Sequence, residues 1–219
     1  MYKQLKIPDE SRMLPLTIRN YGRGDFANLI ALQERCFPPP FPSELWWNED
    51  QLTEHVSRFP EGALCAEADG AIVGSMTTLR ATVPESHDWA SMTDNGYIRN
   101  HEPGGDTVYV VDLCVDPRYR KLGLGKWLMQ SMYETVVHLG CRRLLGGGRM
   151  PGYKAHSDKL SPEEYVRRVC EGELRDPVLT FMLRCGRLPA GIAADYLEDE
   201  QSLNYAALME WRNPFMMER

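Results

Sequence analysis

A basic, glycine-containing turn that follows an apolar run is the part of this sequence best suited to chemistry. Residues 107–115 are almost continuously apolar, and residues 118–126 then read Arg-Tyr-Arg-Lys-Leu-Gly-Leu-Gly-Lys. The start of a helix carries unpaired backbone NH groups and a partial positive charge, which attract phosphate. Glycine lets a ligand approach the backbone closely. The pattern therefore predicts a diphosphate-binding turn between a strand and a helix.

The residues around this turn exclude two common nucleotide-binding loops. A dinucleotide-binding fingerprint requires glycine three residues after Gly125, where the chain has Leu128. A P-loop requires serine or threonine after the Gly-Lys pair, where the chain has Trp127. A nucleotide-dependent kinase or dehydrogenase is therefore a poor match.

Composition indicates that one globular domain positions this turn. The chain has 219 residues with 43% hydrophobic and 26% charged side chains, close to ordinary globular averages. We expect a polar N-terminal extension over residues 1–13 and a single domain over residues 14–213. The elements expected in order are strand, helix, helix, three strands, helix, strand, helix and two strands, an α/β (α+β) arrangement. A long loop is expected over residues 82–106, and an insertion containing a short helix over residues 147–175.

The same composition bounds the partners and the compartment. With 25 Lys+Arg against 31 Asp+Glu, the net charge of −6 argues against nucleic-acid binding. No apolar run approaches the ~20 residues that cross a bilayer, and the first residues lack a secretory signal, so we expect a cytoplasmic protein without membrane association. Six scattered cysteines and five dispersed histidines predict buried thiols and no metal site.

The segment around the turn resembles a known family. Arg120-x-x-Gly123-x-Gly125, placed after a Leu113-x-Val115 strand, is similar to the acyl-CoA-binding motif of the GNAT N-acetyltransferase superfamily. The stretch over residues 146–179 also resembles a subgroup that is sometimes joined to a nitrilase-type carbon–nitrogen hydrolase. The resemblance implies the GNAT fold, a mixed and mostly antiparallel central sheet flanked by helices.

This resemblance also implies how a co-substrate would bind. Acetyl-CoA would lie with its pantetheine arm paired to Leu113 and Val115 as an extra strand, where the central strand splays from its neighbour. A free backbone NH near Leu113 or Cys114 would stabilise the oxyanion when an amine attacks the thioester. Backbone NH groups of the turn would hold the pyrophosphate; these belong to Arg120, Lys121, Leu122, Gly123, Leu124, Gly125 and Lys126.

Several side chains are candidates for proton transfer. Asp112 is the only charged residue between Thr107 and Val115, and it serves equally well as a general base or as a buried acid that holds a neighbouring loop. Tyr109 occupies the position where some relatives keep a glutamate base. The usual tyrosine acid of the family is replaced by Met182 here. Its substitutes remain open among four residues, which are Tyr153, His156, Tyr196 and Tyr205.

The acceptor pocket is expected at the splayed end of the sheet. Trp46 and Trp47 follow a proline run, and we expect one to line the pocket and the other to lie in the core. Arg149 and Tyr153, in the insertion, are candidates for covering the acceptor, although a solvated loop is the simpler interpretation. Cys114 is expected to be a small buried hydrophobe rather than a nucleophile.

We therefore expect an N-acetyltransferase that transfers an acetyl group from acetyl-CoA to a small-molecule amine by direct attack. The alternative is a catalytically weak module that binds CoA or a partner. The family resemblance further suggests a homodimer and a functional association with a carbon–nitrogen hydrolase.

Overall fold

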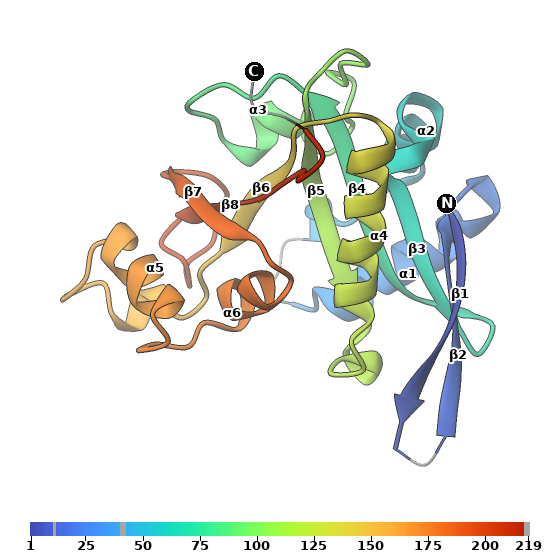
Figure 1. Ribbon diagram of the computed structural model, residues 1–219, viewed down its shortest axis with the longest axis horizontal. Helices are drawn as coiled ribbons and strands as arrows, with labels where there is room; N and C mark the ends of the chain where they lie inside the picture. The colour runs from blue at the N-terminus through green and yellow to red at the C-terminus, as the bar shows by residue number, and fades with distance from the viewer. Residues whose placement is uncertain (11, 40–42, 217–219) are drawn as a thin grey trace.

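A single mixed sheet organises the molecule. The computed structural model describes residues 1–10, 12–39 and 43–216, and within them eight strands pair in the order β1-β2-β3-β4-β5-β6-β8-β7 (Figure 1). Every neighbouring pair is antiparallel except β5 and β6, which are parallel, so the predicted mixed, mostly antiparallel GNAT sheet is confirmed. The strands are β1 (Tyr2–Asp9), β2 (Arg12–Asn20), β3 (Ala63–Ala68), β4 (Ala71–Ala81), β5 (Thr107–Val115), β6 (Arg143–Arg149), β7 (Leu188–Ala193) and β8 (Ala206–Arg212).

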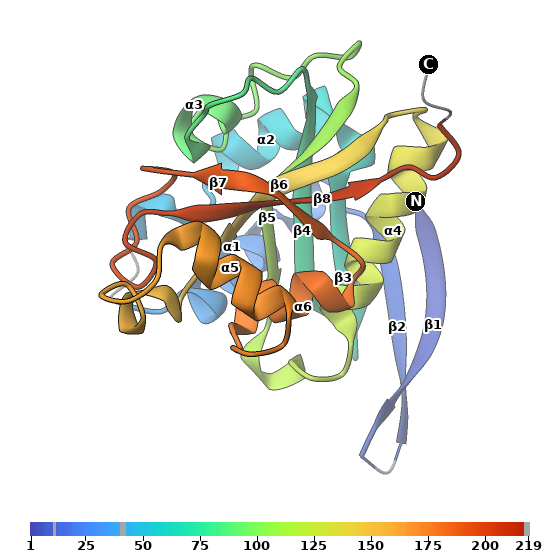
Figure 2. The ribbon, with the colours of Figure 1, turned by 60° about the vertical axis from the view of Figure 1, so that its left-hand side comes forward.

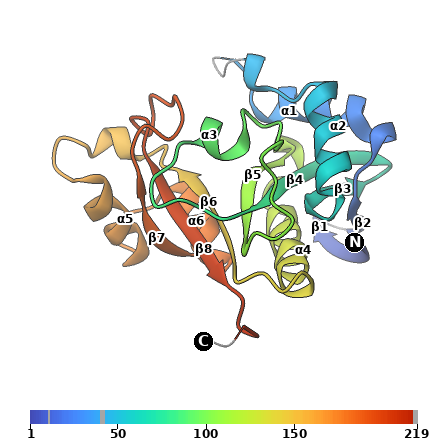
Figure 3. The same cartoon turned by 90° about the horizontal axis from the view of Figure 1, so that it is seen from above.

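Helices cover both faces of the sheet. Figure 3 shows α1, α2 and α3 on one face and α4 on the other, with α6 on the same side as α4 and α5 at the outer end beside β7. The helices are α1 (Phe26–Cys36), α2 (Glu49–Arg58), α3 (Trp89–Thr93), α4 (Leu124–His138), α5 (Pro162–Cys170) and α6 (Pro177–Arg184). The main hydrophobic core lies between the sheet and the helices α1, α2 and α4, and a second cluster joins α5 and α6 to β8.

The first residues belong to the sheet, whereas the sequence predicted a polar extension over residues 1–13. Strand β1 pairs with β2 from Tyr2 opposite Arg19 to Asp9 opposite Arg12. Lys3, Leu5 and Ile7 alternate with more exposed residues, and Ile7 is buried. The exposed Tyr2 and the inward-facing Lys3 hide this alternation in the sequence, because each has the opposite polarity to that expected at its position in a period of two.

Several element boundaries also differ from expectation. Helix α2 begins at Glu49, because Asn48 and Gln51 form a reciprocal capping box. The long loop over residues 82–106 contains α3, which Asp88 caps. Strand β6 runs to Arg149 instead of ending at residue 146, so the insertion begins later than expected. Residues 40–42 of the proline run lie outside the described residues.

No helix within the described ranges is both long and apolar enough to cross a membrane.

Candidate functional site

The central feature is an opening between two neighbouring parallel strands. Strands β5 and β6 pair only over Thr107–Tyr109 and the facing residues 143–145. Beyond Tyr109 the two strands diverge, and Figure 2 shows β6, β8 and β7 crossing β4 and β5 at a steep angle. The expected splay of the central strand is therefore present, and it leaves the β6-facing edge of residues 110–115 without a strand partner in the described structure.

A bulge in β5 decides which side chains face the same way. The register with β4 shifts so that Val110 faces Thr78 while Asp112 faces Thr77, leaving Val111 as the extra residue. The indole NH of Trp89 donates a hydrogen bond to the carbonyl oxygen of Val111 at 3.0 Å. Because of the bulge, Tyr109 and Asp112 point to the same face of the sheet, which is the face covered by α1.

Asp112 lies against α1 in partly buried surroundings. Its Oδ2 accepts a hydrogen bond from Nε2 of Gln33 at 2.9 Å. Burial raises the pKa of Asp112 to about 6, and the hydrogen bond from Gln33 opposes this rise. A carboxylate with this pKa can both accept and return a proton near neutral pH.

Cys114 is a buried thiol next to this carboxylate. Its sulfur lies 3.3 Å from Oγ of Ser75 and 3.7 Å from Nε2 of Gln33. A hydrogen bond with Cys36 and burial both raise the pKa of the Cys114 thiol, so it stays protonated. This environment opposes a nucleophilic thiolate.

The turn after β5 presents a row of unpaired backbone NH groups. Lys121 and Gly123 have positive φ values of 72° and 83°, which turns the chain into the start of α4. Among the described residues, no hydrogen-bond acceptor is found for the backbone NH groups of residues 121–126. The NH of Arg120, by contrast, bonds to the carbonyl of Pro117 at 3.4 Å. The geometry therefore offers six donors at one helix N-terminus.

The buried carboxylate of Asp116 anchors this turn. Asp116 caps the backbone NH of Arg118 at 3.0 Å and also receives its side chain. From α1, Nε of Arg35 reaches the same carboxylate at 2.8 Å. Hydrogen bonds from Arg118, and then from Arg35, lower the pKa of Asp116 against the effect of burial. The turn is thereby fixed relative to both β5 and α1.

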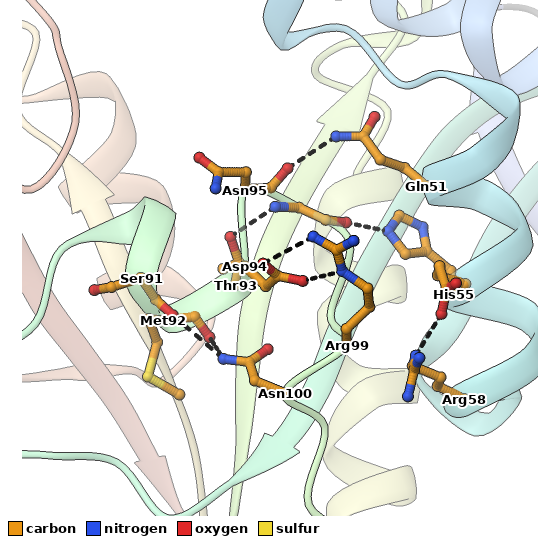
Figure 4. A network of polar contacts seen from close by, with 12 residues as sticks. Gln51, His55, Arg58, Ser91, Met92, Thr93, Asp94, Asn95, Arg99 and Asn100 are labelled. Atoms are coloured by element: carbon orange, nitrogen blue, oxygen red, sulfur yellow. Dashed lines mark hydrogen bonds and ion pairs between the residues drawn. The ribbon is translucent and has the colours of Figure 1, made fainter.

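The loop that carries α3 is anchored to α2 by polar contacts (Figure 4). Nε2 of Gln51 donates a hydrogen bond to the carbonyl oxygen of Asn95 at 2.9 Å. Nε2 of His55 lies 2.6 Å from the carbonyl oxygen of Gly96. Within the loop, the side-chain amide of Asn100 donates a hydrogen bond to the carbonyl oxygen of Met92 at 2.9 Å. These contacts hold the loop over the face of β5 that carries Asp112.

Tyr109 lies inside a chain of polar side chains on this face. Its hydroxyl is 2.9 Å from Nε2 of His87, which comes from the long loop, and 2.8 Å from the hydroxyl of Tyr196, which precedes β8. Sequence reasoning placed neither His87 nor the contact with Tyr196 here. The glycine run of β6 was the available sequence signal for Tyr196. A Cβ atom at Gly147 would lie 2.3 Å from the Tyr196 ring, so only glycine leaves room for that ring.

Gly146 and Gly148, the other two glycines of β6, leave space for the side chains of Val110 and Met182. A Cβ at Gly146 would lie 2.8 Å from Cβ of Val110, and one at Gly148 would lie 2.8 Å from the sulfur of Met182. Met182, which occupies the position of the family's tyrosine acid, therefore packs against the splayed strand as an apolar side chain. No proton donor stands there.

The residues expected to line the acceptor pocket mostly have structural partners. Trp47 is buried edge-on against the ring of His55, while Trp46 is partly buried and donates to the carbonyl of Phe37. Arg149 forms a two-pronged ion pair with Asp199 at 2.7 and 2.8 Å. Tyr153 is buried in the second hydrophobic cluster. These contacts show how each side chain is held, and the role of all four residues in an acceptor pocket stays a prediction.

The comparison with known proteins agrees with this geometry. Residues 26–156 match the acetyltransferase (GNAT) family, and the chain belongs to that family. It is 56% identical to the uncharacterized N-acetyltransferase YkwB of Bacillus subtilis (strain 168) over 97% of this chain and 96% of that protein.

The chain is also similar to a longer curated protein and to a solved GNAT-like structure. The chain is 37% identical to the probable hydrolase YhcX of the same organism over 90% of this chain, which corresponds to 39% of that protein. Among solved structures, the GphF GNAT-like decarboxylase in complex with isobutyryl-CoA is 28% identical, with a TM-score of 0.73, covering 90% of this chain and 98% of that chain.

Proposed function

We propose that this protein transfers an acetyl group from acetyl-CoA to the amine of a small-molecule acceptor. The observation that carries the proposal is the row of backbone NH groups without acceptors at residues 121–126, at the end of a strand that opens away from its neighbour. Unpaired NH donors at a helix N-terminus suit the oxygens of a diphosphate. The family's preference for CoA derivatives, and the isobutyryl-CoA bound to the GphF enzyme, support this assignment.

The acyl donor enters on the side of α4 and reaches the opening along β5. The diphosphate binds the NH groups of residues 121–126, with Arg120, Lys121 and Lys126 nearby. The pantetheine arm pairs with the free edge at Leu113 and Val115 as an added strand. This places the thioester carbonyl beside the backbone near Cys114, where an NH group stabilises the oxyanion by roughly 3–4 kcal/mol.

Asp112 moves the proton that bond formation releases. The neutral amine attacks the thioester carbon, the carbon–sulfur bond breaks, and the CoA thiolate leaves. Asp112 takes a proton from the attacking nitrogen and returns one to the sulfur, which a pKa of about 6 permits in both directions. This role replaces the tyrosine acid that is absent at Met182.

Two glycines at opposite ends of α4 provide a matched test of the donor site. Gly123 and Gly140 both have positive φ values, 83° and 61°, and neither has an atom within 4 Å of its Cβ position. A valine strains the backbone at either position, but only Gly123 lies in the proposed diphosphate turn. Calorimetric titration with CoA should show at least about a tenfold loss of affinity in Gly123→Val, corresponding to about 1.4 kcal/mol, and little change in Gly140→Val. Equal affinities in the two variants would place the diphosphate elsewhere.

A second candidate function is decarboxylation of an acyl-CoA whose acyl chain carries a carboxylate. The 28% identity and the TM-score of 0.73 with a GNAT-like decarboxylase favour it. An assay with malonyl-CoA and methylmalonyl-CoA that measures carbon dioxide, run beside an amine screen that measures released CoA, separates the two reactions. CoA binding without either product would instead support the catalytically weak binding module.

The similarity to a probable hydrolase also bears on partners. The 37% identity with a probable hydrolase, of which this chain spans 39%, is compatible with the association with a carbon–nitrogen hydrolase that the family resemblance suggests. Co-purification with such a hydrolase from the same cell tests it, and a homodimer is tested by light scattering.

A further inference from the structure

Three polar side chains form a continuous chain of hydrogen bonds at the apex of the opening. The hydroxyl of Tyr109 lies 2.9 Å from Nε2 of His87 and 2.8 Å from the hydroxyl of Tyr196. Both tyrosines are buried, at 0% and 4% exposure. Two buried phenols that contact each other and an imidazole are an arrangement that core packing alone does not require.

The position of this chain relates it to the reacting groups. Tyr109 is the last residue of β5 that pairs with β6, where it faces Leu145. The Tyr196 hydroxyl lies 2.6 Å from the Cβ position of Gly147, so it sits against β6 just beyond the last paired residue. Tyr109 also shares its face of β5 with Asp112. The Tyr196 oxygen is thus the member of the chain that lies nearest the opening.

Hydrogen-bond chemistry gives the chain a direction. Nδ1 of His87 lies 3.3 Å from the carbonyl oxygen of Pro84, which only accepts, so Nδ1 carries the proton of the neutral ring. Nε2 is then an acceptor for the Tyr109 hydroxyl, whose oxygen in turn accepts from Tyr196. Burial lowers the pKa of His87 and raises the pKa of both phenols, so all three groups are neutral at pH 7. Each proton points away from the opening and toward His87.

The outer end of the chain meets a cavity. His87 is partly exposed and lines a cavity of about 220 Å³ together with Thr82, Ser86, Ser91 and Glu102. A space of this size, lined by both polar and apolar groups, has room for several water molecules. A proton that reaches His87 therefore has water to receive it.

The charged groups around the chain favour proton movement along it. Asp88 and Arg143 lie near His87. The buried guanidinium of Arg187 lowers the pKa of both phenols against the effect of burial, and no acceptor for its Nε and Nη1 is found in the described part of the chain. A nearby positive charge stabilises a phenol oxygen while it exchanges its proton.

We propose that Tyr196, Tyr109 and His87 form a proton relay that deprotonates the ammonium form of the acceptor and releases the proton at the cavity. This inference rests on the acyltransfer function proposed above. Overall, R–NH₃⁺ and acetyl-CoA give R–NH–CO–CH₃, CoA–SH and one H⁺, so one proton per turnover must leave the site. The ammonium passes a proton to the oxygen of Tyr196, Tyr196 passes its own to Tyr109, and Tyr109 passes its own to Nε2 of His87. The resulting imidazolium loses a proton to water, while Asp112 handles the second proton, which ends on sulfur.

One experiment tests the relay without turnover. Long-range ¹H–¹⁵N NMR of the wild-type protein should show His87 as the neutral ring with its proton on Nδ1. The Tyr109→Phe variant, which removes the donor to Nε2, should shift the Nε2 resonance of His87. A proton on Nε2 in the wild type would reverse the direction of the chain and overturn the proposal.

A second experiment uses two amines that differ in protonation at pH 7. Ethylamine is an ammonium ion there and needs the relay, whereas hydroxylamine is already neutral. With acetyl-CoA as donor and released CoA as readout, Tyr196→Phe and His87→Gln should lower the ethylamine rate about tenfold to a hundredfold and the hydroxylamine rate less than about threefold. Tyr133→Phe is the matched control, because its hydroxyl bonds to the carbonyl oxygen of Cys185 on the opposite face of the sheet.

Each outcome of the second experiment has a distinct meaning. Equal losses with both amines, or no loss with either, would overturn the relay and leave these side chains with a structural role. If the wild-type protein released no more CoA with either amine than an enzyme-free mixture does, the result would count against the acyltransfer function itself. The two failures are distinguishable because the NMR experiment depends on neither amine.

Discussion

The side-chain amide of Gln33 in α1 donates a hydrogen bond to the carboxylate of Asp112 in β5 across 2.9 Å. This contact joins a helix to the central strand at the point where the strand leaves its parallel neighbour. Hydrogen bonds from the Cys114 thiol and the Leu113 backbone also lower the pKa of Asp112 against the effect of burial. The pair therefore sets both the orientation and the acidity of the group proposed to carry the reaction's second proton.

Replacing Asp112 with asparagine should stabilise the protein while it lowers activity. Burial raises the pKa of Asp112 to about 6, above the ~4 of an unfolded aspartate, so the folded protein loses stability as pH rises from 4 through 6. Asp112→Asn avoids this cost while its side-chain oxygen still accepts from Gln33. Urea unfolding should show a gain on the order of 2 kcal/mol at pH 7.5 that disappears near pH 4. If Asp112→Asn were less stable than the wild type at pH 7.5, the ionised Asp112 carboxylate would not be destabilised by its burial.

The ion pairs of Asp116 should contribute stability above pH 4. Its pKa is lowered, so its contribution is present above the unfolded value and is lost as pH falls below it. Asp116→Asn keeps the cap on Arg118 but loses the charge that holds two arginines, and we expect a cost of about 1–3 kcal/mol at pH 7. CoA affinity should fall with it, because the turn loses its brace. If the variant unfolds at the same urea concentration as the wild type at pH 7 and at pH 3, the brace has no energetic role.

His55 should make the protein sensitive to mild acid. It is fully buried between the hydroxyl of Tyr21 and the carbonyl of Gly96, and burial lowers its pKa to about 4. Because the unfolded histidine titrates near 6.5, the folded state loses stability as pH falls from about 6.5 toward 4, by up to about 3 kcal/mol. Unfolding midpoints measured from pH 7.5 to 5 should fall steeply in the wild type and less steeply in His55→Gln. The exposed His138 provides the control, since His138→Gln should retain the steep slope.

A single methyl group on β6 should disturb the apex of the opening. The Cβ of Gly147→Ala would lie 2.3 Å from the ring of Tyr196, whereas that of Gly191→Ala in β7 meets only Leu208 at 3.9 Å. We expect Gly147→Ala to cost about 1–3 kcal/mol through overpacking and to lower activity, while Gly191→Ala stays close to the wild type. Thermal unfolding and the ethylamine assay measure both effects. Similar behaviour of the two variants would mean that Tyr196 moves aside freely.

The sequence predicted the strand, turn and helix start over residues 107–126 because these elements depend on local signals. The apolar run before Arg118 and the glycines at 123 and 125 each act within a few residues, and the structure contains the corresponding strand and helix start. The β1 strand was missed because Lys3 stands at an inward-facing position and interrupts its alternation.

The acceptor side of the site was less predictable because it depends on contacts between distant segments. Tyr109, His87 and Tyr196 meet across separations of 22 and 87 residues. The bulge at Val111 places Tyr109 and Asp112 on one face of the sheet. No residue near Val111 in the sequence predicts this bulge. The same applies to the ion pair of Arg149 with Asp199, which lies 50 residues away along the sequence.

The two outer strands of the sheet have a consequence for solubility during folding. At one border, β1 presents Lys3, Lys6 and Pro8 along its length, and at the other, β7 contains Pro189 and a register shift next to it. Charges, prolines and irregular spacing hinder the docking of a foreign strand. Both borders are therefore poor templates for cross-β aggregation, so concentrated preparations of the protein should resist amyloid-like assembly even though its sheet is open at each end.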